Sequence, residues 1–286
     1  MAKRKSSKKQ SQGVIYLIVL ACLALICREP IARALQDKLP VIKERITQKA
    51  TPAITGSPLH PAPLKNVPEQ ILHRKGYTTS YNREHKIPTW VAWELTPEKL
   101  IERESRTDKF LPDPDLPESQ AVTTDDYKRS GMDRGHMCPA GDNRWHWKAM
   151  QESFYMTDIC PQNHNLNRGD WKELEDACRL WTKKEGKLYI VCGPVLYRQK
   201  HRTIGRKHKV TVPEAFFKVI LSTRNGHPKA IGFIFKNLSG NHPLKNYVNS
   251  VDEVERITGI DFFPALPDDV EKKVEAMQDL NLWSFR

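Results

Sequence analysis

Hydrophobic residues gather in five short runs between residues 77 and 236, and these runs predict β-strands. They are rich in β-branched and aromatic side chains, which favour a pleated, half-buried backbone. The predicted strands cover residues 77–82, 90–96, 187–196, 216–223 and 230–236. Asn225-Gly226 lies between the last two runs and predicts a tight hairpin turn, because both residues tolerate a positive φ angle.

Elsewhere the apolar residues recur with the spacing of a helix. The predicted helices cover residues 145–156, 168–184, 251–258 and 268–280. The second of them carries one apolar stripe that should face the core. This stripe consists of Trp171, Leu174, Cys178 and Trp181. Ser250, with Glu253 three positions later, predicts a capping box at the start of the third helix.

The order of these elements predicts the fold class. The strands are grouped with helices inserted among them, instead of alternating with helices one by one. This arrangement favours an α+β fold, with a mostly antiparallel sheet and flanking helices. We expect the folded domain to cover residues 68–286. Residues 28–67 predict a tether, because residues 51–68 are rich in proline and small residues and show no periodicity.

The first 27 residues differ from the rest of the chain. Residues 1–13 form a basic leader with five Lys or Arg side chains and no acid, and residues 14–27 are uninterruptedly apolar. This run is shorter than the roughly 20 residues that span a bilayer, and its length also suits the centre of a signal peptide. A basic leader before an apolar run fits either a membrane anchor or a signal peptide. We favour an uncleaved transmembrane signal anchor, because Arg28 and Glu29 separate the run from Ala32-Arg33-Ala34, where a peptidase would cut.

An anchor of this kind would leave the basic leader in the cytosol. The folded domain would then lie on the outer or periplasmic side of the cell membrane, attached by a single span. Cleavage would instead give a secreted domain. A lipid anchor at Cys22 is a weaker alternative, since the apolar run continues beyond it.

Charge narrows the range of partners. The formal net charge is +12 at pH 7, and the leader carries five of these positive charges. A basic surface attracts polyanions such as nucleic acids or anionic lipid headgroups. A soluble basic protein with no such partner has the same composition, so charge alone does not decide between them.

The cysteines argue against a zinc protein. Two of the six lie in the apolar run, and the domain holds the others: Cys138, Cys160, Cys178 and Cys192. No Cys-x-x-Cys pair is present, although structural zinc sites usually contain one. In an exported domain these thiols could form one or two disulfides, whose pairing the sequence does not define.

Four consecutive residues, Asp133-Arg134-Gly135-His136, supply candidate chemistry. Three further polar residues follow in or next to the predicted helix 168–184. They are Asn167, Glu175 and Arg179, spaced by eight and four residues. With 3.6 residues per turn, this spacing places them along one edge of the helix. The set combines an imidazole, an amide, a carboxylate and guanidinium groups.

Breaking a phosphodiester bond requires an activated water and neutralisation of the phosphate charge. His136 can act as the general base, because imidazole titrates near neutral pH. Asn167 offers a hard amide oxygen suited to Mg²⁺, and Glu175 can hold one of the metal's waters. Arginines can bind phosphate in a bidentate manner, and the candidates are Arg134, Arg179 and Arg106.

Each of these residues also has an ordinary structural interpretation. Asn167 could cap the following helix, Glu175 and Arg179 could form a helix salt bridge, and Asp133 with Arg134 could form an ion pair. The combination favours the catalytic interpretation over these single explanations. Asp133 and Gly135 are expected to hold the strand that presents the histidine.

The segments DRGHMCPAGDNRW and FYMTDICPQNHNLNRGDWKELE resemble the DNA/RNA non-specific endonucleases. These enzymes belong to the ββα-metal, or His-Me finger, group and include endonuclease G. The similarity extends over residues 71–270 and includes the segments CGPV, VP, FK and SVDEVE. Because ordered motifs along the whole domain agree, the resemblance is specific.

The resemblance implies a Mg²⁺-dependent endonuclease that cuts DNA and RNA with little sequence preference and leaves 5′-phosphate ends. It implies that His136 is the general base and that Asn167 binds a single Mg²⁺, for which Mn²⁺ could substitute. It places Glu175 near the metal's waters and assigns Arg134, Arg179 and Arg106 to the phosphate. Many relatives act as homodimers, so a homodimer is an expected alternative to the monomer.

One departure and two rival functions remain open. Many relatives carry Ser-Asn where this chain has Thr157-Asp158, and the change could alter metal binding or the pH optimum. The first rival is a non-catalytic, membrane-tethered module of the same fold that binds nucleic acid. The second is a membrane-surface protein whose basic charge binds lipid, which gives His136, Asn167 and Glu175 no role.

Overall fold

The computed structural model describes residues 57–65 and 67–283. The chain divides into two compact units, residues 1–53 and 54–286, and every described residue belongs to the second unit. The predicted basic leader and apolar run, and most of the predicted tether, lie outside the described residues. Among the helices of the described part, none is both long and apolar enough to cross a membrane.

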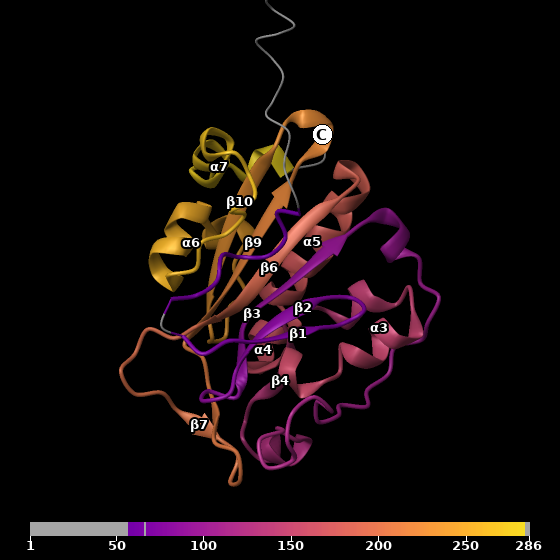
Figure 1. Cartoon of the computed structure of the whole chain (residues 1–286), viewed down its shortest axis with the longest axis vertical. Coiled ribbons are helices and arrows are strands. Elements are labelled where there is room, and N and C mark those ends of the chain that lie inside the picture. Colours follow the sequence, from indigo (N-terminus) through magenta and orange to yellow (C-terminus); the bar gives the residue numbers. More distant parts are fainter. Residues whose placement is uncertain (1–56, 66, 284–286) are drawn as a thin grey trace, which may run out of the picture. The chain divides into compact units, whose positions relative to one another are not determined.

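A seven-stranded antiparallel sheet forms the centre of the domain (Figure 1). Its strands, in spatial order, are β1 (Gln70–His73), β2 (Thr78–Asn82), β3 (Ile87–Leu95), β6 (Leu188–Val195), β9 (Ala215–Ser222), β10 (Lys229–Lys236) and β11 (Val248–Asn249). The five strands expected from the hydrophobic runs are present. The α+β class with a mostly antiparallel sheet is therefore confirmed, and Asn225 and Gly226 adopt the positive φ angles expected of the hairpin turn.

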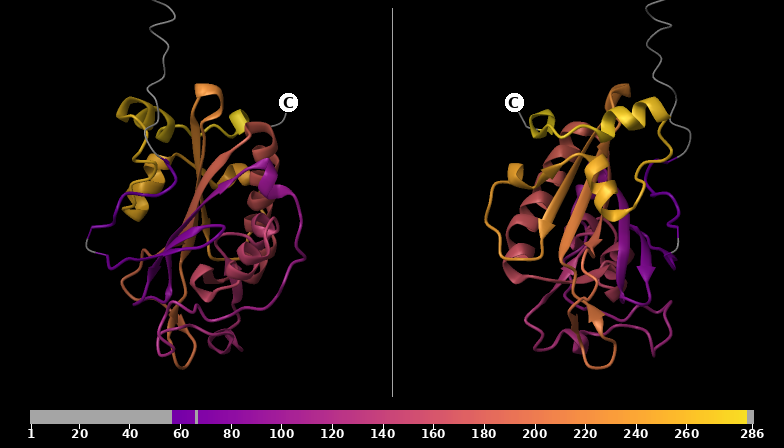
Figure 2. Two further views of the ribbon diagram at one scale, coloured as in Figure 1. Left: turned by 45° about the vertical axis from the view of Figure 1, so that its right-hand side comes forward. Right: turned by 90° about the vertical axis from the view of Figure 1, so that its left-hand side faces the viewer.

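Helices lie on both faces of this sheet (Figure 2). They are α3 (Trp147–Glu152), α4 (His164–Arg168), α5 (Asp170–Glu185), α6 (Val251–Thr258) and α7 (Asp268–Glu275). Helix α5 packs into one hydrophobic core through its predicted stripe, whose four residues are all buried. Helices α6 and α7 pack into a second core on the opposite face. Two two-stranded ribbons complete the described part: β4 (Asp133–His136) with β5 (Ile159–Gln162), and β7 (Thr203–Ile204) with β8 (Val210–Thr211).

The predicted helix over residues 168–184 is wrong at its beginning. Two helices, α4 and α5, meet at Gly169, whose backbone angles (φ −104°, ψ −110°) are not helical. A Cβ atom at Gly169 would lie 2.6 Å from the carbonyl oxygen of Asn165, so only glycine fits this corner. Asn167 therefore lies inside α4 and does not cap α5, and the cap of α4 is Asn163. Asn167, Glu175 and Arg179 do not share the edge of one helix.

Two other predicted helices are shorter than expected. Helix α3 begins after His146, because the His146 Nδ1 accepts a hydrogen bond from the Lys148 N–H and caps the helix. Helix α7 ends at Glu275. In α6, Ser250 Oγ accepts the Glu253 N–H as expected, but the Glu253 carboxylate pairs with Arg256 and does not complete a capping box. The sequence reading also missed the short strand β1, which has little hydrophobic alternation.

The domain includes residues that we expected in the tether. The Ala62 N–H donates to the carbonyl oxygen of Asp261, and the Leu64 N–H donates to the Glu69 carboxylate. The side chains of Leu59 and Leu64 pack against the core beneath α6 and α7. The folded part therefore begins before residue 68.

Candidate active site

The β4–β5 ribbon presents the tetrapeptide Asp133-Arg134-Gly135-His136 beside α4 and α5. It pairs Asp133 with Gln162 and His136 with Ile159 in antiparallel register. A Cβ atom at Gly135 would lie 2.1 Å from Gln162 Oε1, so glycine lets the two strands approach here. The predicted structural role of Gly135 in this strand is consistent with this contact. The ribbon is followed in the chain by α4, which gives a strand–strand–helix unit.

His136 is held in an apolar and basic environment. Its ring forms a three-ring cluster with Phe110 and Phe154, whose centroids are 5.3 and 4.9 Å away, and the side chain is buried. The Trp171 indole N–H donates to the His136 backbone carbonyl and connects β4 to α5. Burial, followed by the positive charges of Arg106 and Arg134, lowers the pKa of His136 to about 3. The imidazole is therefore neutral at physiological pH, which is the form that accepts a proton.

The two ring nitrogens of His136 have different surroundings. Neither forms a hydrogen bond with a described residue, and Nε2 is shut off from solvent. Of the two nitrogens only Nε2 is both buried and without a partner, so Nδ1 is the nitrogen that a water molecule can reach. A general base needs such access to the proton that it removes.

Asn167 is oriented by the first residue of β4. Its Nδ2 donates to Asp133 Oδ2 over 2.9 Å, and Asp133 also contacts His164 Nδ1 at 3.1 Å. Because the Asn167 amide nitrogen is bound in this way, the amide oxygen is the atom left to bind a ligand. A neutral oxygen held by a carboxylate suits a hard divalent cation, so the residues present fit the metal site that the sequence predicts.

Glu175 lies half-buried on α5 near a buried cation. Burial raises the pKa of Glu175 to about 7, and the positive charge of Lys218 is the largest influence that opposes this rise. Lys218 is fully buried on β9, with its Nζ 4.3 Å from the Trp171 ring centroid and 5.4 Å from that of Trp93. Its Nζ has no hydrogen-bond partner among the described residues. Lys218 therefore stabilises the ionised form of Glu175 through space.

The three arginines differ in their availability. Arg134 lies on the solvent side of β4, with its guanidinium 4.2 Å from the centroid of the Phe110 ring. Arg106 is half-exposed and stacks over Phe154 at 5.3 Å. Arg179 is held by two carboxylates, Asp142 at 2.7 Å and Asp176 at 2.6 Å. Arg134 has no ion pair among the described residues, whereas Arg106 has one exposed pair with Asp108 at 3.3 Å. Both can meet a phosphate more readily than Arg179, which is largely committed to its two ion pairs.

Asp158 is the residue at which the sequence departs from the expected family pattern. Its side chain is fully buried, and Oδ1 accepts the Cys138 N–H over 2.9 Å. Burial, and to a smaller degree the neighbouring Glu175, raise the pKa of Asp158 well above its usual range. The raised pKa favours the neutral carboxyl, which has about the size and the charge of an asparagine side chain.

A surface cleft of about 470 Å³ opens next to these residues. Arg134, Asn167 and Asp133 line it together with Phe110 and Lys128, whereas His136 and Glu175 are not part of its lining. Lys128 also lines a second, larger cleft of about 830 Å³, which we call the basic cleft. The cations that line the basic cleft are Lys128, Arg129, Arg202, Arg206 and Lys207.

Lys218 was missed as a functional residue in the sequence, although a signal was present. It is the single charged residue in the apolar strand run of β9. A lysine in such a run either faces solvent or is buried near a group that stabilises its charge, because lysines are rarely buried otherwise. The four described cysteines are all free and buried, so none of them forms a disulfide within the described part.

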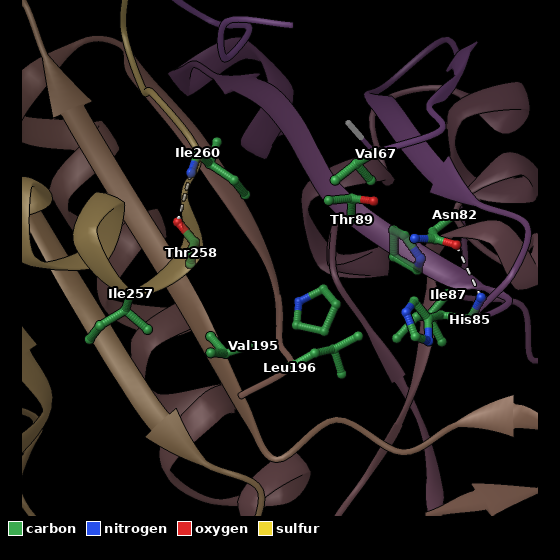
Figure 3. A pocket seen from close by; sticks show the side chains of 12 residues that line it. Val67, Asn82, His85, Ile87, Thr89, Val195, Leu196, Ile257, Thr258 and Ile260 are labelled. Atoms are coloured by element: carbon green, nitrogen blue, oxygen red, sulfur yellow. Dashed lines mark hydrogen bonds between the residues drawn. The ribbon is translucent and has the colours of Figure 1, made fainter. Parts of the chain in front are cut away.

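An apolar pocket elsewhere on the domain does not carry the same chemistry. It has a volume of about 190 Å³ and lies between β3, β6 and the end of α6 (Figure 3). Its lining includes Ile87, Val195 and Ile260, and His85 is its one histidine. No carboxylate lines it, so this pocket lacks an acidic group that could take part in hydrolysis.

Comparisons with known proteins agree with this geometry. The sequence profile of the family described as DNA/RNA non-specific endonuclease matches residues 60–269. The "Nuclease EXOG, mitochondrial" of Danio rerio is 35% identical over 251 residues, which cover 81% of this chain and 73% of that protein. A protein named "Nuclease" from Nostoc sp. is 33% identical over 258 residues, which cover 85% of this chain and 92% of that protein.

A solved structure shares the fold. A chain in the crystal structure of the EndoG/EndoGI complex superposes with a TM-score of 0.68 at 28% sequence identity. The superposition covers 77% of this chain and 95% of the other. With the profile match over most of the domain, these similarities show that the chain belongs to the DNA/RNA non-specific endonuclease family.

Proposed function

We propose that this enzyme hydrolyses phosphodiester bonds in DNA and RNA with one Mg²⁺ ion, for which Mn²⁺ can substitute. The observation that carries the proposal is one strand, β4, that holds the neutral, desolvated His136, the accessible Arg134, and Asp133, which orients the Asn167 amide. We infer that β4, β5 and α4 form the ββα-metal motif of the family. The family's relatives are named nucleases, which supports the same activity here.

In the mechanism that we infer, His136 Nδ1 removes a proton from a water that attacks phosphorus. Arg134 and Arg106 bind the phosphate and balance its negative charge. They also keep His136 unprotonated, because a cation near an imidazole disfavours its charged form. Asn167 supplies a direct metal ligand, and the bound metal would stabilise the developing charge and the leaving oxygen.

Glu175 and Arg179 have supporting roles in this proposal. Glu175, ionised with the help of Lys218, would accept hydrogen bonds from water molecules on a metal held by Asn167. Arg179 keeps the end of α5 in place through Asp142, which also accepts the Trp93 indole N–H. A contact between Arg179 and substrate would use the guanidinium N–H groups that the two carboxylates leave unbound.

The polynucleotide would extend from the active site into the basic cleft. Lys128 lines both clefts, so the positive surface is continuous between them. Contacts of lysine and arginine with phosphates carry no base information, which agrees with cleavage that has little sequence preference. Cleavage on the side of the phosphate that leaves 5′-phosphate ends is part of the proposal, and ligation of the products tests it.

The direct test uses the purified full-length chain with plasmid DNA and with RNA. Both substrates should be degraded with Mg²⁺ and protected by a chelator. His136→Ala should abolish cleavage but keep binding in a gel-shift assay, and His227→Ala, an exposed histidine outside the site, should cleave normally. Binding without cleavage by the unchanged chain would instead identify a non-catalytic nucleic-acid-binding module. Cleavage by His136→Ala would reject His136 as the base.

We also propose that the domain acts outside the cytosol, held by the N-terminal anchor or released by cleavage. The support is the order of basic leader and apolar run, together with the hazard of a non-specific nuclease beside the chromosome. A phosphatase that is active only after export, fused to the C-terminus, should be active. An active reporter that works only in the cytosol would overturn the proposal.

A further inference from the structure

Three carboxylates meet between α6 and α7, on the face of the sheet opposite α5. Asp252 and Glu255 lie three residues apart on α6 and therefore point to the same side of the helix. Glu275 is the last residue of α7. One carboxylate oxygen from each of the three lies within 4.8 Å of the others. We call these residues the α6–α7 cluster.

Glu275 is the residue that makes the cluster unusual. It is 5% exposed, and its Oε1 is buried without a hydrogen-bond partner among the described residues. Buried polar atoms nearly always have a partner, because an unpaired one loses its hydrogen bonds to water without replacement, and a charged one loses more. The Glu275 oxygen thus lacks a group that should satisfy it.

The other two carboxylates are arranged as open ligands. Glu255 Oε1 accepts the Phe262 N–H over 2.7 Å, which fixes the side chain and leaves its second oxygen available. Asp252 is exposed, so it forms the side of the cluster that solvent reaches. In the cluster, Glu275 is therefore buried, Glu255 is fixed by a hydrogen bond, and Asp252 is accessible to solvent.

Negative charge in this region has no matching cation. Burial, then the neighbouring carboxylates Glu255 and Glu271, raise the pKa of Glu275 to about 9. Asp261 and Glu271 add to the same field. Within residues 57–65 and 67–283, no lysine, arginine or histidine lies within 4 Å of any of these five carboxylates in an ion pair. The repulsion would be relieved by a bound cation.

We propose that the α6–α7 cluster binds one Ca²⁺ ion that connects the two helices. Calcium takes oxygen ligands at about 2.3–2.6 Å, so ligand oxygens around one ion lie at most about 5 Å apart, and the three carboxylate oxygens here lie within 4.8 Å of one another. Carboxylates alone do not suit zinc, which prefers nitrogen and sulfur ligands, and Mg²⁺ demands a tighter octahedron. Waters on the Asp252 side complete the coordination.

This ion has a structural role that is separate from catalysis. Helices α6 and α7 belong to the second core, whereas β4 and α5 carry the candidate active site and pack into the first. By joining the two helices, the ion ties the end of the domain to β9 and β10. The proposal does not depend on the nuclease activity.

The test measures Ca²⁺ binding by the full-length chain in an Asn167→Ala background, which removes the other candidate metal ligand. Equilibrium dialysis with Ca²⁺ should find one ion per chain. Thermal unfolding should shift upward by about 5 °C or more when Ca²⁺ exceeds its Kd 100-fold. Adding Glu275→Gln should abolish both effects, while adding Asp269→Asn, an exposed carboxylate on the same helix, should leave both in place.

Two results would overturn the proposal. One is the absence of bound Ca²⁺ in the Asn167→Ala protein, which would mean that Glu275 is protonated and holds no ion. This measurement requires no second substitution. The other is unchanged binding after Glu275→Gln, which would place the ion elsewhere; Glu255→Gln repeats this test if Glu275→Gln does not fold. Because Asn167→Ala is already expected to be inactive, a failure of the proposed nuclease function does not affect either readout.

Discussion

Lys218 provides the sharpest test of how the site is tuned, because its charge acts on Glu175 without a direct bond. Its ammonium is fully buried between Trp171 and Trp93 and is the largest influence that favours ionised Glu175. Lys218→Met removes the charge and keeps a side chain of similar length. We predict that this change moves the acid limb of the activity profile upward.

The expected size follows from the pKa of Glu175, which is about 7. His136 remains a neutral base far below that pH, since its pKa is about 3, so ionisation of Glu175 limits activity on the acid side. Losing a nearby opposite charge raises a carboxyl pKa by about 1–2 units. The ionised fraction of Glu175 at pH 7 then falls by about 5- to 50-fold, and at pH 9 the loss shrinks to about twofold or less.

Stability should respond differently from activity. Removing the buried ammonium relieves a desolvation penalty of several kcal/mol, whereas the lost attraction to Glu175 and the lost cation–π contacts cost a similar amount. These effects roughly offset each other. The free energy of unfolding should therefore change by less than about 2 kcal/mol, measured by urea denaturation.

The assay is kcat/KM on a fluorescent oligonucleotide with Mg²⁺ from pH 5 to pH 10. Lys236→Met, an exposed lysine on β10, serves as the matched control and should follow the unchanged protein. A loss of activity in Lys218→Met that is equal at every pH would refute the electrostatic reasoning. A loss of more than about 4 kcal/mol in stability would show that the ammonium is needed for folding instead.

Other residues give separate predictions. His136→Gln should make the stability of the fold less sensitive to acid. The pKa of His136 in the folded protein, about 3, lies below the ordinary value of about 6.5, so stability present above pH 6.5 is lost as the pH falls toward 3, by up to about 5 kcal/mol. Urea denaturation from pH 4 to 7 should show a shallower dependence of the unfolding free energy on pH in the variant. Asp158→Asn should keep its activity at neutral pH, because burial raises the pKa of Asp158 and favours the neutral carboxyl, and a large loss in a cleavage assay at pH 7 would contradict this reasoning. Arg206→Ala should weaken nucleic-acid binding and reduce the salt slope of the binding constant by about 1, whereas Arg256→Ala on α6, outside the basic cleft, should leave the slope unchanged.

Local sequence signals were sufficient for the regular elements. The strand runs and the apolar stripe of α5 follow from burial, which a chain records as hydrophobic periodicity. The stripe residues Trp171 and Cys178 point inward as expected, and Ser250 caps α6. These features depend on neighbours within one or two turns of the chain, so no tertiary information was needed.

The break between α4 and α5 at Gly169 could not be predicted from the hydrophobic period. The helical period continues through residues 168–184, but the carbonyl oxygen of Asn165 leaves room for nothing larger than glycine, and the chain turns there. Asn167 consequently sits on α4 and is oriented by Asp133, which is 34 residues away in sequence. A contact between such distant residues leaves no periodic signal.

The sequence by itself determined the fold class, the candidate base and the candidate metal ligand, because strand and helix patterns are local and the motif residues are chemically distinctive. Only the tertiary structure decided the burial, the protonation and the ion pairs of the site residues. It buried His136 against Phe110 and Phe154, placed Lys218 near Glu175, and bound Arg179 to two carboxylates. Proton affinity depends on desolvation and on charges brought close by folding, and neither quantity is written in the order of residues along the chain.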